Sequence, residues 1–263
     1  RGSDIWERGS QGRERRRCMQ MVFQNPSGSM NPRRTVGASV AEPLWAKGIR
    51  KTRDRVEHML GLVGLDPKMA DRMPHEMSGG QQQRASIARA LIAEPALVVH
   101  DESLASLDIS LQAQVINLLL DLQERLGASY LFISHDLAAV QAISHRVAVM
   151  YLGEVVEAAT AEAFAGYPLH PYSVALRRDA LDPDPVIERN RPELVLKGDV
   201  PSPLRPPSGC RFRTRCPLAA PRCAEEKPLL RDMGGGHLVA CHFPGRSEEL
   251  ARTVLQGAKP SRA

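Results

Sequence analysis

The chain has 263 residues, 43% of them hydrophobic and 25% charged, values ordinary for a soluble protein with one sizeable core and an appendage. No apolar run approaches the roughly 18 residues that span a bilayer, and the polar start Arg1-Gly2-Ser3-Asp4 is not a secretory signal, so we expect a cytoplasmic protein that reaches a membrane only through a partner. The net charge of +5 is accompanied by no interleaved aromatic residues and no nucleic-acid module, so we favour scattered surface charge over a nucleic-acid partner. A basic face near anionic lipid headgroups is also compatible with this charge.

The first half of the chain predicts one short strand followed by helices. Residues 1–18 form a polar, basic surface segment, and the strand Met19–Phe23 ends at the turn Gln24-Asn25-Pro26. From about Met30 to Glu94 the apolar spacing is mainly helical, with one helix over Lys51–Gly61.

A further helix begins at Ser78. Ser78 and Gln81 have the three-residue spacing of a capping box, in which each side chain bonds the other's backbone N–H, and Pro95 ends this helix. Ser78-Gly79-Gly80 also offers a hydroxyl and unhindered N–H groups at a helix N-terminus, which favours an anion site. Taken alone, the same residues could be a plain helix cap.

The second half alternates strands and helices. Strands are predicted at Leu97–Val99, Tyr130–Ile133 and Val147–Tyr151. A long helix follows Asp108 and stops at Gly127, and a shorter one covers Leu137–Ser144. Short apolar strands between amphipathic helices predict an α/β fold whose parallel sheet is covered by helices on both faces.

After about Gly166 the composition changes. Ten of the twenty prolines lie between Pro183 and Pro228, and little periodicity remains. Residues 167–263 are therefore interpreted as a loop-rich C-terminal extension that needs more than apolar burial to hold it together. Four of the five cysteines lie in this extension.

Asp101 and Glu102 follow a buried strand directly, at the carboxyl end where α/β sheets place ligands. Two carboxylates beside an apolar strand are unfavourable without a cation or a donor nearby. We therefore favour a functional role over the alternative, in which the pair merely caps the next helix.

Five segments, in this order and spacing, resemble the motifs of ABC-type ATPases: Val22-Phe23-Gln24-Asn25-Pro26, Met77-Ser78-Gly79-Gly80-Gln81, Asp101-Glu102, Ser106-Leu107-Asp108 and Ile133-Ser134-His135-Asp136. Met30-Asn31-Pro32-Arg33, His170-Pro171-Tyr172 and the cysteine-bearing tail narrow the resemblance to the ATP-binding subunits of bacterial oligopeptide, dipeptide and nickel importers. The resemblance implies a P-loop NTPase core at 1–166 with a helical subdomain at about 27–95, followed by the extension at 167–263.

The resemblance also implies a role for each motif residue. ATP and Mg²⁺ would be the cofactors, with Asp101 and Gln24 near the metal, Glu102 polarising the attacking water and His135 contacting the γ-phosphate. Ser78, Gly79, Gly80 and Gln81 would contact ATP held by a second ATPase subunit, with Asp108 beside them. Taken singly, Gln24 could be a turn residue, His135 a structural histidine and Asp108 an N-cap.

Three features depart from the family pattern. Ser103-Leu104-Ala105 stands where the family usually has Pro-Thr-Ser or a close variant, which should loosen the turn after Glu102, and Met77 replaces the commoner Leu. No G-x-x-x-x-G-K-[ST] phosphate loop occurs in the 263 residues, and the chain begins with Arg1. We expect an N-terminally truncated subunit that hydrolyses essentially no ATP alone.

Cys210, Cys216, Cys223 and Cys241 have the spacing C-x5-C-x6-C-x17-C, which fits neither a zinc ribbon nor a ferredoxin. A cytosolic location disfavours disulfides, which leaves a metal or free thiols. Resemblance to the family's extension implies a [4Fe-4S] cluster, which we favour over zinc, with free thiols third and His237 or His242 as alternative ligands. Cys18 is expected to be an isolated buried thiol.

The leading hypothesis is therefore an ATP-hydrolysing subunit of a peptide-class ABC importer, peripheral on the cytoplasmic face of the plasma membrane. Its partners would be a second ATPase subunit, identical or not, two membrane permeases and, indirectly, an extracytoplasmic peptide-binding protein. One alternative is a non-catalytic subunit that lends only its signature motif to a partner's ATP. A metal-binding regulatory protein is a third hypothesis, which rests on charge and cysteines alone.

Overall fold

The computed structural model describes residues 9–105, 107–180, 194 and 196–255. Ser106, which belongs to the Ser106-Leu107-Asp108 motif, lies outside the described residues. So do three prolines of the C-terminal extension, Pro183, Pro185 and Pro192. Two compact units, residues 1–143 and 144–263, are described separately below. This division differs from the domain boundary at 166/167 that the resemblance implies, and that boundary stays a prediction. Among the described residues, no helix is both long enough and apolar enough to cross a membrane.

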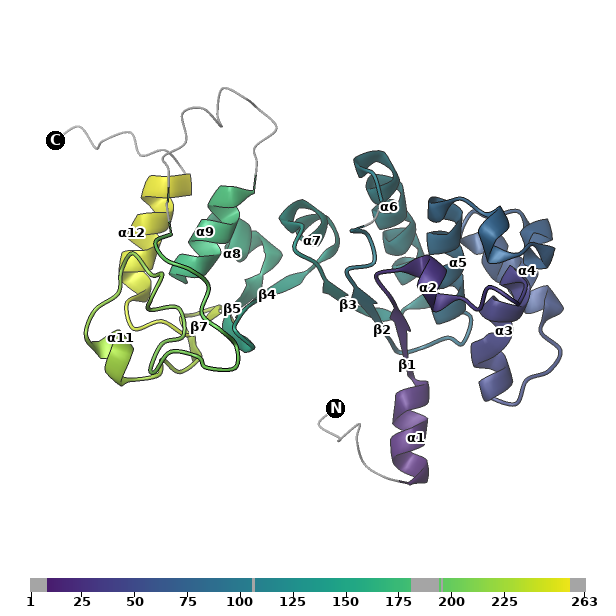
Figure 1. The fold of residues 1–263 in the computed structure, drawn as a ribbon, viewed down its shortest axis with the longest axis horizontal. Coiled ribbons are helices and arrows are strands. Elements are labelled where there is room, and N and C mark those ends of the chain that lie inside the picture. Colours follow the sequence, from purple (N-terminus) through teal and green to yellow (C-terminus); the bar gives the residue numbers. More distant parts are fainter. Residues whose placement is uncertain (1–8, 106, 181–193, 195, 256–263) are drawn as a thin grey trace. The chain divides into compact units, whose positions relative to one another are not determined.

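Unit 1 is built on a three-stranded sheet. Strands β1 (Met19–Val22), β2 (Leu97–Asp101) and β3 (Ser129–Ile133) are all parallel and lie in the order β1-β2-β3 (Figure 1). The register pairs Val22 with His100 and Asp101 with Ile133, so all three strands end at one edge of the sheet. The predicted parallel α/β arrangement is confirmed for these three strands. The strand predicted at Val147–Tyr151 instead pairs antiparallel with residues Glu154–Thr160 and is not part of the parallel sheet.

The two faces of this sheet differ. Val22, Val98 and His100 are buried on one face. On the other face Leu131 and Ile133 are 51% and 45% exposed. The prediction of a sheet covered on both faces is therefore wrong for the described part of unit 1, because the described helices leave the apolar side chains of Leu131 and Ile133 on the second face largely exposed.

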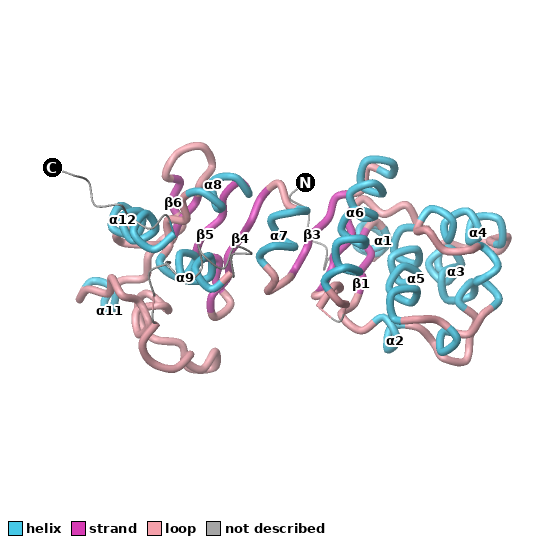
Figure 2. Tube along the Cα trace, turned by 90° about the horizontal axis from the view of Figure 1, so that it is seen from above, coloured by secondary structure: helices cyan, strands magenta, loops and turns pink. Residues whose placement is uncertain are grey.

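Nine helical segments surround or extend from this sheet in the described residues of unit 1, and three of them have fewer than six residues. They are α1 (Ser10–Arg17), α2 (Pro26–Ser29), α3 (Val36–Ala46), α4 (Arg53–Leu62), η1 (Pro67–Asp71), η2 (Pro74–Glu76), α5 (Gly79–Leu91), α6 (Ile109–Leu126) and α7 (Leu137–Ile143). Helices α3, α4 and α5 gather into one group (Figure 2). They lie within residues 27–95, where the resemblance implies a helical subdomain, and that assignment stays a prediction.

The ends of α5 and α6 are capped as the sequence predicts. The Ser78 hydroxyl accepts a hydrogen bond from the Gln81 N–H at 3.3 Å, and the Gln81 side chain accepts one from the Ser78 N–H at 3.0 Å. Asp108 accepts from the Leu111 N–H at 2.9 Å, and Gly127 ends α6 with φ of 65°. These local contacts fix where both helices begin.

Unit 2 contains an antiparallel sheet in the order β4-β5-β7-β6, of which β4, β5 and β7 are labelled in Figure 1. Its strands are β4 (Arg146–Tyr151), β5 (Glu154–Thr160), β6 (Arg231–Asp232) and β7 (Leu238–Val239). Its helices are α8 (Ala161–Gly166), α9 (Pro171–Asp179), α11 (Arg222–Glu225) and α12 (Pro244–Leu255). The extension thus adds two strands to the β4–β5 hairpin, and the 12-residue helix α12 was not predicted from the sequence.

An aromatic cluster within unit 2 joins the Cys210-Arg211-Phe212 segment to β4 and to the start of α9. Phe212, only 1% exposed, packs edge-on against Tyr151 with ring centroids 5.1 Å apart. It also lies 5.4 Å from the Tyr172 ring and 5.6 Å from the His170 ring. The two sequence motifs His170-Pro171-Tyr172 and Cys210-Arg211-Phe212 therefore meet in one core, where aromatic burial contributes most.

A buried carboxylate ties three segments of unit 2 together. Glu157 on β5 is 1% exposed and accepts hydrogen bonds from the N–H groups of Leu169 and His170 at 2.7 and 2.9 Å. The His237 Nε2 lies 2.6 Å from the same carboxylate. Because a buried carboxylate needs partners, this cluster supplies the polar stabilisation that an extension short of apolar residues requires.

Replacing His170 with Asn should weaken the acid sensitivity of the fold. Burial lowers the pKa of His170 from 6.5 to about 4. The unfolded chain therefore binds a proton at His170 between these pH values while the folded chain does not, so this group should remove about 2–3 kcal/mol of stability as the pH falls from 7 to 4. The free energy of unfolding in urea at pH 7 and pH 4.5 measures the effect.

Asn can keep the helix cap, since the His170 Nδ1 accepts the Tyr172 N–H and Asn is a good N-cap residue. Carboxylates that titrate in both proteins cancel in the comparison. Equal losses of stability between pH 7 and pH 4.5 in the two proteins would contradict the prediction.

Candidate functional site

Three predicted residues from the ends of three parallel strands meet at one edge of the unit 1 sheet. The Gln24 Nε2 donates a hydrogen bond to Glu102 Oε2 at 2.8 Å. The His135 Nδ1 lies 3.2 Å from Glu102 Oε1. Gln24 follows β1, Glu102 follows β2 and His135 follows β3, so the shared register of the strands is what brings these side chains together.

Glu102 is held in an unusual backbone conformation. Its φ is 45°, in the left-handed region that residues with a Cβ seldom adopt. Its N–H donates to the Ile133 carbonyl at 2.9 Å, which ties it to the end of β3. The Glu102 side chain is 34% exposed and that of His135 is 74% exposed, so both can be reached from solvent.

Asp101 is the last residue of β2 and is half-buried beside this cluster. No group of three or more His, Cys, Asp or Glu side chains in the described residues is arranged to hold a metal ion by itself. Mg²⁺ in phosphate-transferring sites uses one or two carboxylates together with phosphate oxygens and water. Asp101 and the amide oxygen of Gln24, which takes no part in the bond to Glu102, are the oxygen donors that fit this chemistry.

The predicted anion site lies at the start of α5. Ser78 and Gly79 are exposed, and a Cβ placed on Gly79 would meet nothing within 4 Å. A Cβ on Gly80 would touch Leu111 at 3.5 Å, so the start of α5 lies beside the start of α6, which Asp108 caps. Free N–H groups and the helix dipole favour an anion at this open surface.

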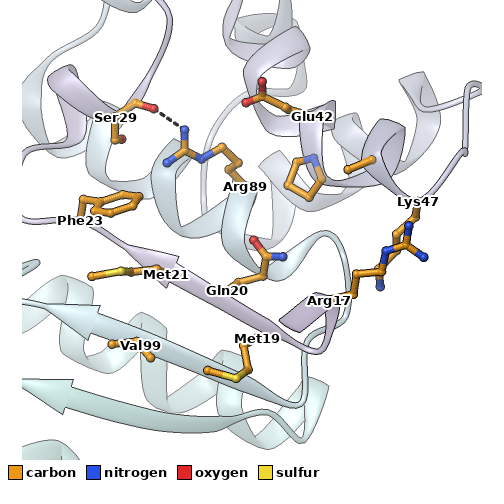
Figure 3. A pocket seen from close by; sticks show the side chains of 12 residues that line it. Arg17, Met19, Gln20, Met21, Phe23, Ser29, Glu42, Lys47, Arg89 and Val99 are labelled. Atoms are coloured by element: carbon orange, nitrogen blue, oxygen red, sulfur yellow. Dashed lines mark hydrogen bonds between the residues drawn. The ribbon is translucent and has the colours of Figure 1, made fainter. Parts of the chain in front are cut away.

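A hollow of about 520 Å³ opens next to the Gln24 segment of unit 1 (Figure 3). Its apolar lining includes Met19, Met21, Phe23 and Val99. The lining residues from the helices are Ser29, Glu42, Pro43, Ala46, Lys47 and Arg89, with Arg17 and Gln20 completing the set. The hollow could not be predicted from the sequence, because residues of α3 and α5 line it together with residues of β1.

Arg89 illustrates the electrostatics of this hollow. Its guanidinium donates to the Ser29 carbonyl, and burial lowers the pKa of Arg89 while Glu42 raises it (Figure 3). The Lys47 Nζ donates to the Ala93 carbonyl at 2.5 Å. The hollow therefore has an apolar floor with cationic groups at its side.

Two buried residues that the sequence did not single out lie under Glu102. His100 is 1% exposed, and its ring packs against Tyr130 and Phe132 with centroids 5.0 and 5.9 Å apart. Burial lowers the pKa of His100 from 6.5 to about 4, so it is neutral at physiological pH. Ser103 is fully buried, and its Oγ lies 3.4 Å from the His100 Nδ1.

The four cysteines of unit 2 are all free thiols. Burial, assisted by the charges of the other three cysteines, raises the pKa of Cys216 to about 12, while a hydrogen bond with the Leu218 backbone lowers it. The described residues nevertheless contain no group arranged for a metal, so neither the predicted [4Fe-4S] cluster nor zinc is supported.

The other predicted ligands have other partners. His237 contacts Glu157, and the His242 Nε2 lies 2.9 Å from the Glu226 carbonyl oxygen. Cys18 is exposed, which corrects the prediction of a buried thiol. It lies between the end of α1 and β1, where its carbonyl accepts the N–H groups of Ala96 and Leu97 while its side chain faces outward.

Comparisons with known proteins agree with the resemblance. Residues 2–105 match the family described as ABC transporter, and residues 156–223 match the one described as Oligopeptide/dipeptide transporter, C-terminal region. A probable peptide ABC transporter ATP-binding protein of Sinorhizobium fredii is 51% identical over 91% of this chain and 69% of its own length. This chain belongs to the ATP-binding proteins of ABC transporters of the oligopeptide/dipeptide class.

Two further relatives support the same family. The oligopeptide transport ATP-binding protein OppF of Salmonella typhimurium is 51% identical over 87% of this chain and 70% of its own length. OppF of Escherichia coli is 50% identical over 85% of this chain and 68% of its own length. Membership of the ABC family identifies the core as a P-loop NTPase fold, with ATP and Mg²⁺ as its cofactors and ATP hydrolysis as its reaction.

Proposed function

We propose that this chain hydrolyses ATP as one of two ABC subunits and thereby drives the uptake of peptides through a pair of membrane permeases. The observation that carries the proposal is the contact of Gln24 and His135 with the two oxygens of Glu102, at 2.8 and 3.2 Å. A carboxylate held by two polar groups at the edge of a parallel sheet is suited to act as a general base toward water.

Each residue of this cluster has a separate role in the proposal. Glu102 takes a proton from the attacking water, and His135 orients the Glu102 carboxylate and contacts the terminal phosphate. Asp101 and Gln24 would hold Mg²⁺ beside the phosphates, where the ion neutralises the charge that develops during phosphoryl transfer. The backbone of Glu102, bonded to β3, keeps the carboxylate at the sheet edge.

The start of α5 serves the second subunit. Ser78, Gly79 and Gly80 present a hydroxyl and N–H groups on an open surface and would bind the ATP held by a partner subunit, identical or not. Asp108 would face the same partner from the neighbouring start of α6. ATP would then be enclosed between two subunits, and hydrolysis would separate them.

The hollow lined by Phe23 and Met21 would receive a cytoplasmic segment of a permease. Its apolar floor suits a helix with apolar side chains, and its cationic side suits an acidic residue on that helix. Because Phe23 directly precedes Gln24, a segment in the hollow could transmit its movement to Glu102. The proposal therefore has the chain bound through its permeases at the cytoplasmic face of the membrane.

Peptide uptake by cells that depend on this transporter tests the proposal. Cells lacking the chain should fail to take up labelled short peptides, and the intact chain should restore uptake. Met21→Glu, which puts a carboxylate on the apolar floor, should abolish uptake, whereas the same change at exposed Leu204 of unit 2 should not. Peptide uptake that proceeds equally with and without the chain would contradict the proposal.

The second candidate function is a non-catalytic subunit that only lends Ser78–Gln81 to a partner's ATP. Ser103-Leu104-Ala105, which replaces the usual sequence after the catalytic carboxylate, favours it. The intact contacts of Glu102 with Gln24 and His135 favour the first. A metal centre on the four cysteines is not part of either proposal, because the described residues form no metal-binding group there.

A further inference from the structure

The turn that follows β2 holds Glu102 in a conformation that its own sequence does not favour. Glu102 has φ of 45°, and a residue with a Cβ is disfavoured in this region. Neither a glycine nor a proline lies between Asp101 and Asp108 to shape the turn. Contacts from neighbouring residues must therefore hold it.

Backbone contacts account for part of the restraint. The Glu102 N–H is bonded to β3, and the Glu102 carbonyl accepts the Ala105 N–H at 3.1 Å. Leu104, 3% exposed, accepts the Gln112 side chain from α6 at 3.0 Å through its carbonyl. These bonds restrain the Glu102 N–H, the Glu102 carbonyl and the Leu104 carbonyl, and a buried side chain within the turn can add a further restraint.

The Ser103 side chain lies where it can restrain the turn after Glu102. It is fully buried directly after Glu102, and its Oγ lies 3.4 Å from the His100 Nδ1, two residues before Glu102. The His100 ring is itself held between Tyr130 and Phe132 of β3, with centroids 5.0 and 5.9 Å away. The contact thus links Ser103, which follows Glu102, to His100 of β2, which precedes it.

We propose that Ser103 and His100 are positioning residues that hold Glu102 in its left-handed conformation and so keep its carboxylate between Gln24 and His135. In the family that the chain resembles, a proline at the position of Ser103 stiffens this turn. The contact between Ser103 and His100 replaces that restraint, so the turn is not loosened as the sequence alone suggests. This inference rests on the proposed role of Glu102 as the general base.

The alternative is that Ser103 and His100 simply fill the space beneath the turn. A purely filling role would make the loss of the Ser103 hydroxyl nearly silent, because Ala is smaller by one atom and the hydroxyl has no other role. A positioning role would change the dynamics of Glu102 and the rate of hydrolysis while leaving the affinity for ATP unchanged.

The first test uses amide hydrogen exchange on the full chain, which requires no ATP. Ser103→Ala should speed exchange of the Glu102 amide about tenfold while the amides of α5 remain unchanged. His100→Phe should have a similar effect, and the double variant should exceed neither single variant by more than about twofold, because both changes break one contact. Ser110→Ala, at an exposed serine of α6, is the matched control.

Unchanged exchange at Glu102 in Ser103→Ala would overturn the proposal, as would equal acceleration of every amide or fully additive effects of the two variants. Each of these results would mean that the pair fills space or acts on the whole fold.

The second test measures ATP hydrolysis by the purified transporter that contains the chain. Ser103→Ala should lower kcat about tenfold with KM unchanged, and Ser103→Pro should restore most of it. Glu102→Gln is measured alongside. An inactive Glu102→Gln with a fully active Ser103→Ala would overturn the positioning role alone, whereas full activity in both would overturn the proposed role of Glu102 itself.

Discussion

Replacing Gly79 with Asp should abolish ATP hydrolysis at the partner's site of the assembled transporter while leaving the chain folded. Gly79 is the first residue of α5, where Asp is favoured by the helix dipole, and a Cβ there meets nothing within 4 Å. The same carboxylate would face the phosphates that this helix start is proposed to bind. The expected loss of ATP turnover is on the order of 100-fold, comparable to the removal of one strong transition-state donor.

Gly79→Asn is the control, because Asn has the shape of Asp without its charge. We expect the ATPase activity of Gly79→Asn to be at least about tenfold higher than that of Gly79→Asp, since only the carboxylate repels phosphate. Thermal unfolding of both variants should match that of the parent chain. Equal activity of Gly79→Asp and the parent chain would show that the start of α5 binds no phosphate.

Replacing Glu102 with Gln should lower ATP hydrolysis about 100-fold or more without changing the fold. The amide of Gln keeps an oxygen that can accept the Gln24 N–H but cannot take a proton from water. ATP binding and ATP-dependent association of the two subunits should persist or increase, because the bound nucleotide is no longer consumed.

The rate of phosphate release from the assembled transporter measures this effect, with Glu124→Gln on the exposed side of α6 as the control. A Glu102→Gln transporter as active as the parent would contradict the catalytic role. Combined with an inactive Gly79→Asp, that result would identify the chain as the non-catalytic subunit that lends only its helix start.

The parts of unit 1 that local chemistry determines could be predicted from the sequence. The capping box at Ser78 and the N-cap at Asp108 depend on neighbours within three residues, and both are confirmed. The alternation of strand and helix from Leu97 to Ile143 follows from apolar spacing. Gln24, Glu102 and His135 could be placed at one sheet edge because parallel strands end together.

What the sequence could not reveal depends on contacts between distant segments. The contact of Glu157 with His237 spans 80 residues, and the aromatic cluster around Phe212 also joins segments that are distant in the sequence. The strands β6 and β7 have two residues each, too few to show a periodic pattern. Helix α12 does have a signal, since its buried residues Ser247, Ala251 and Val254 have helical spacing after Pro244, although it was not predicted from the sequence. The contact of Ser103 with His100 escaped notice because a serine after a strand normally indicates only a turn.

The cysteines are a different case. Their resemblance to the family's extension suggested a metal, and this prediction is not supported, because the described residues show free thiols and no metal-binding group. The extension is held instead by the Glu157 cluster and by Phe212. Polar contacts of this kind cannot be read from the spacing of cysteines.

ATP-dependent association is the most direct test of the central claim, that this chain and a second ABC subunit enclose ATP between them. Sedimentation of the chain mixed with its partner ATP-binding subunit should show a 1:1 complex in the presence of ATP and separate subunits in its absence. Gly79→Asp should prevent the complex, and Glu102→Gln should preserve it. Association that is indifferent to ATP, or that survives Gly79→Asp unchanged, would contradict the account.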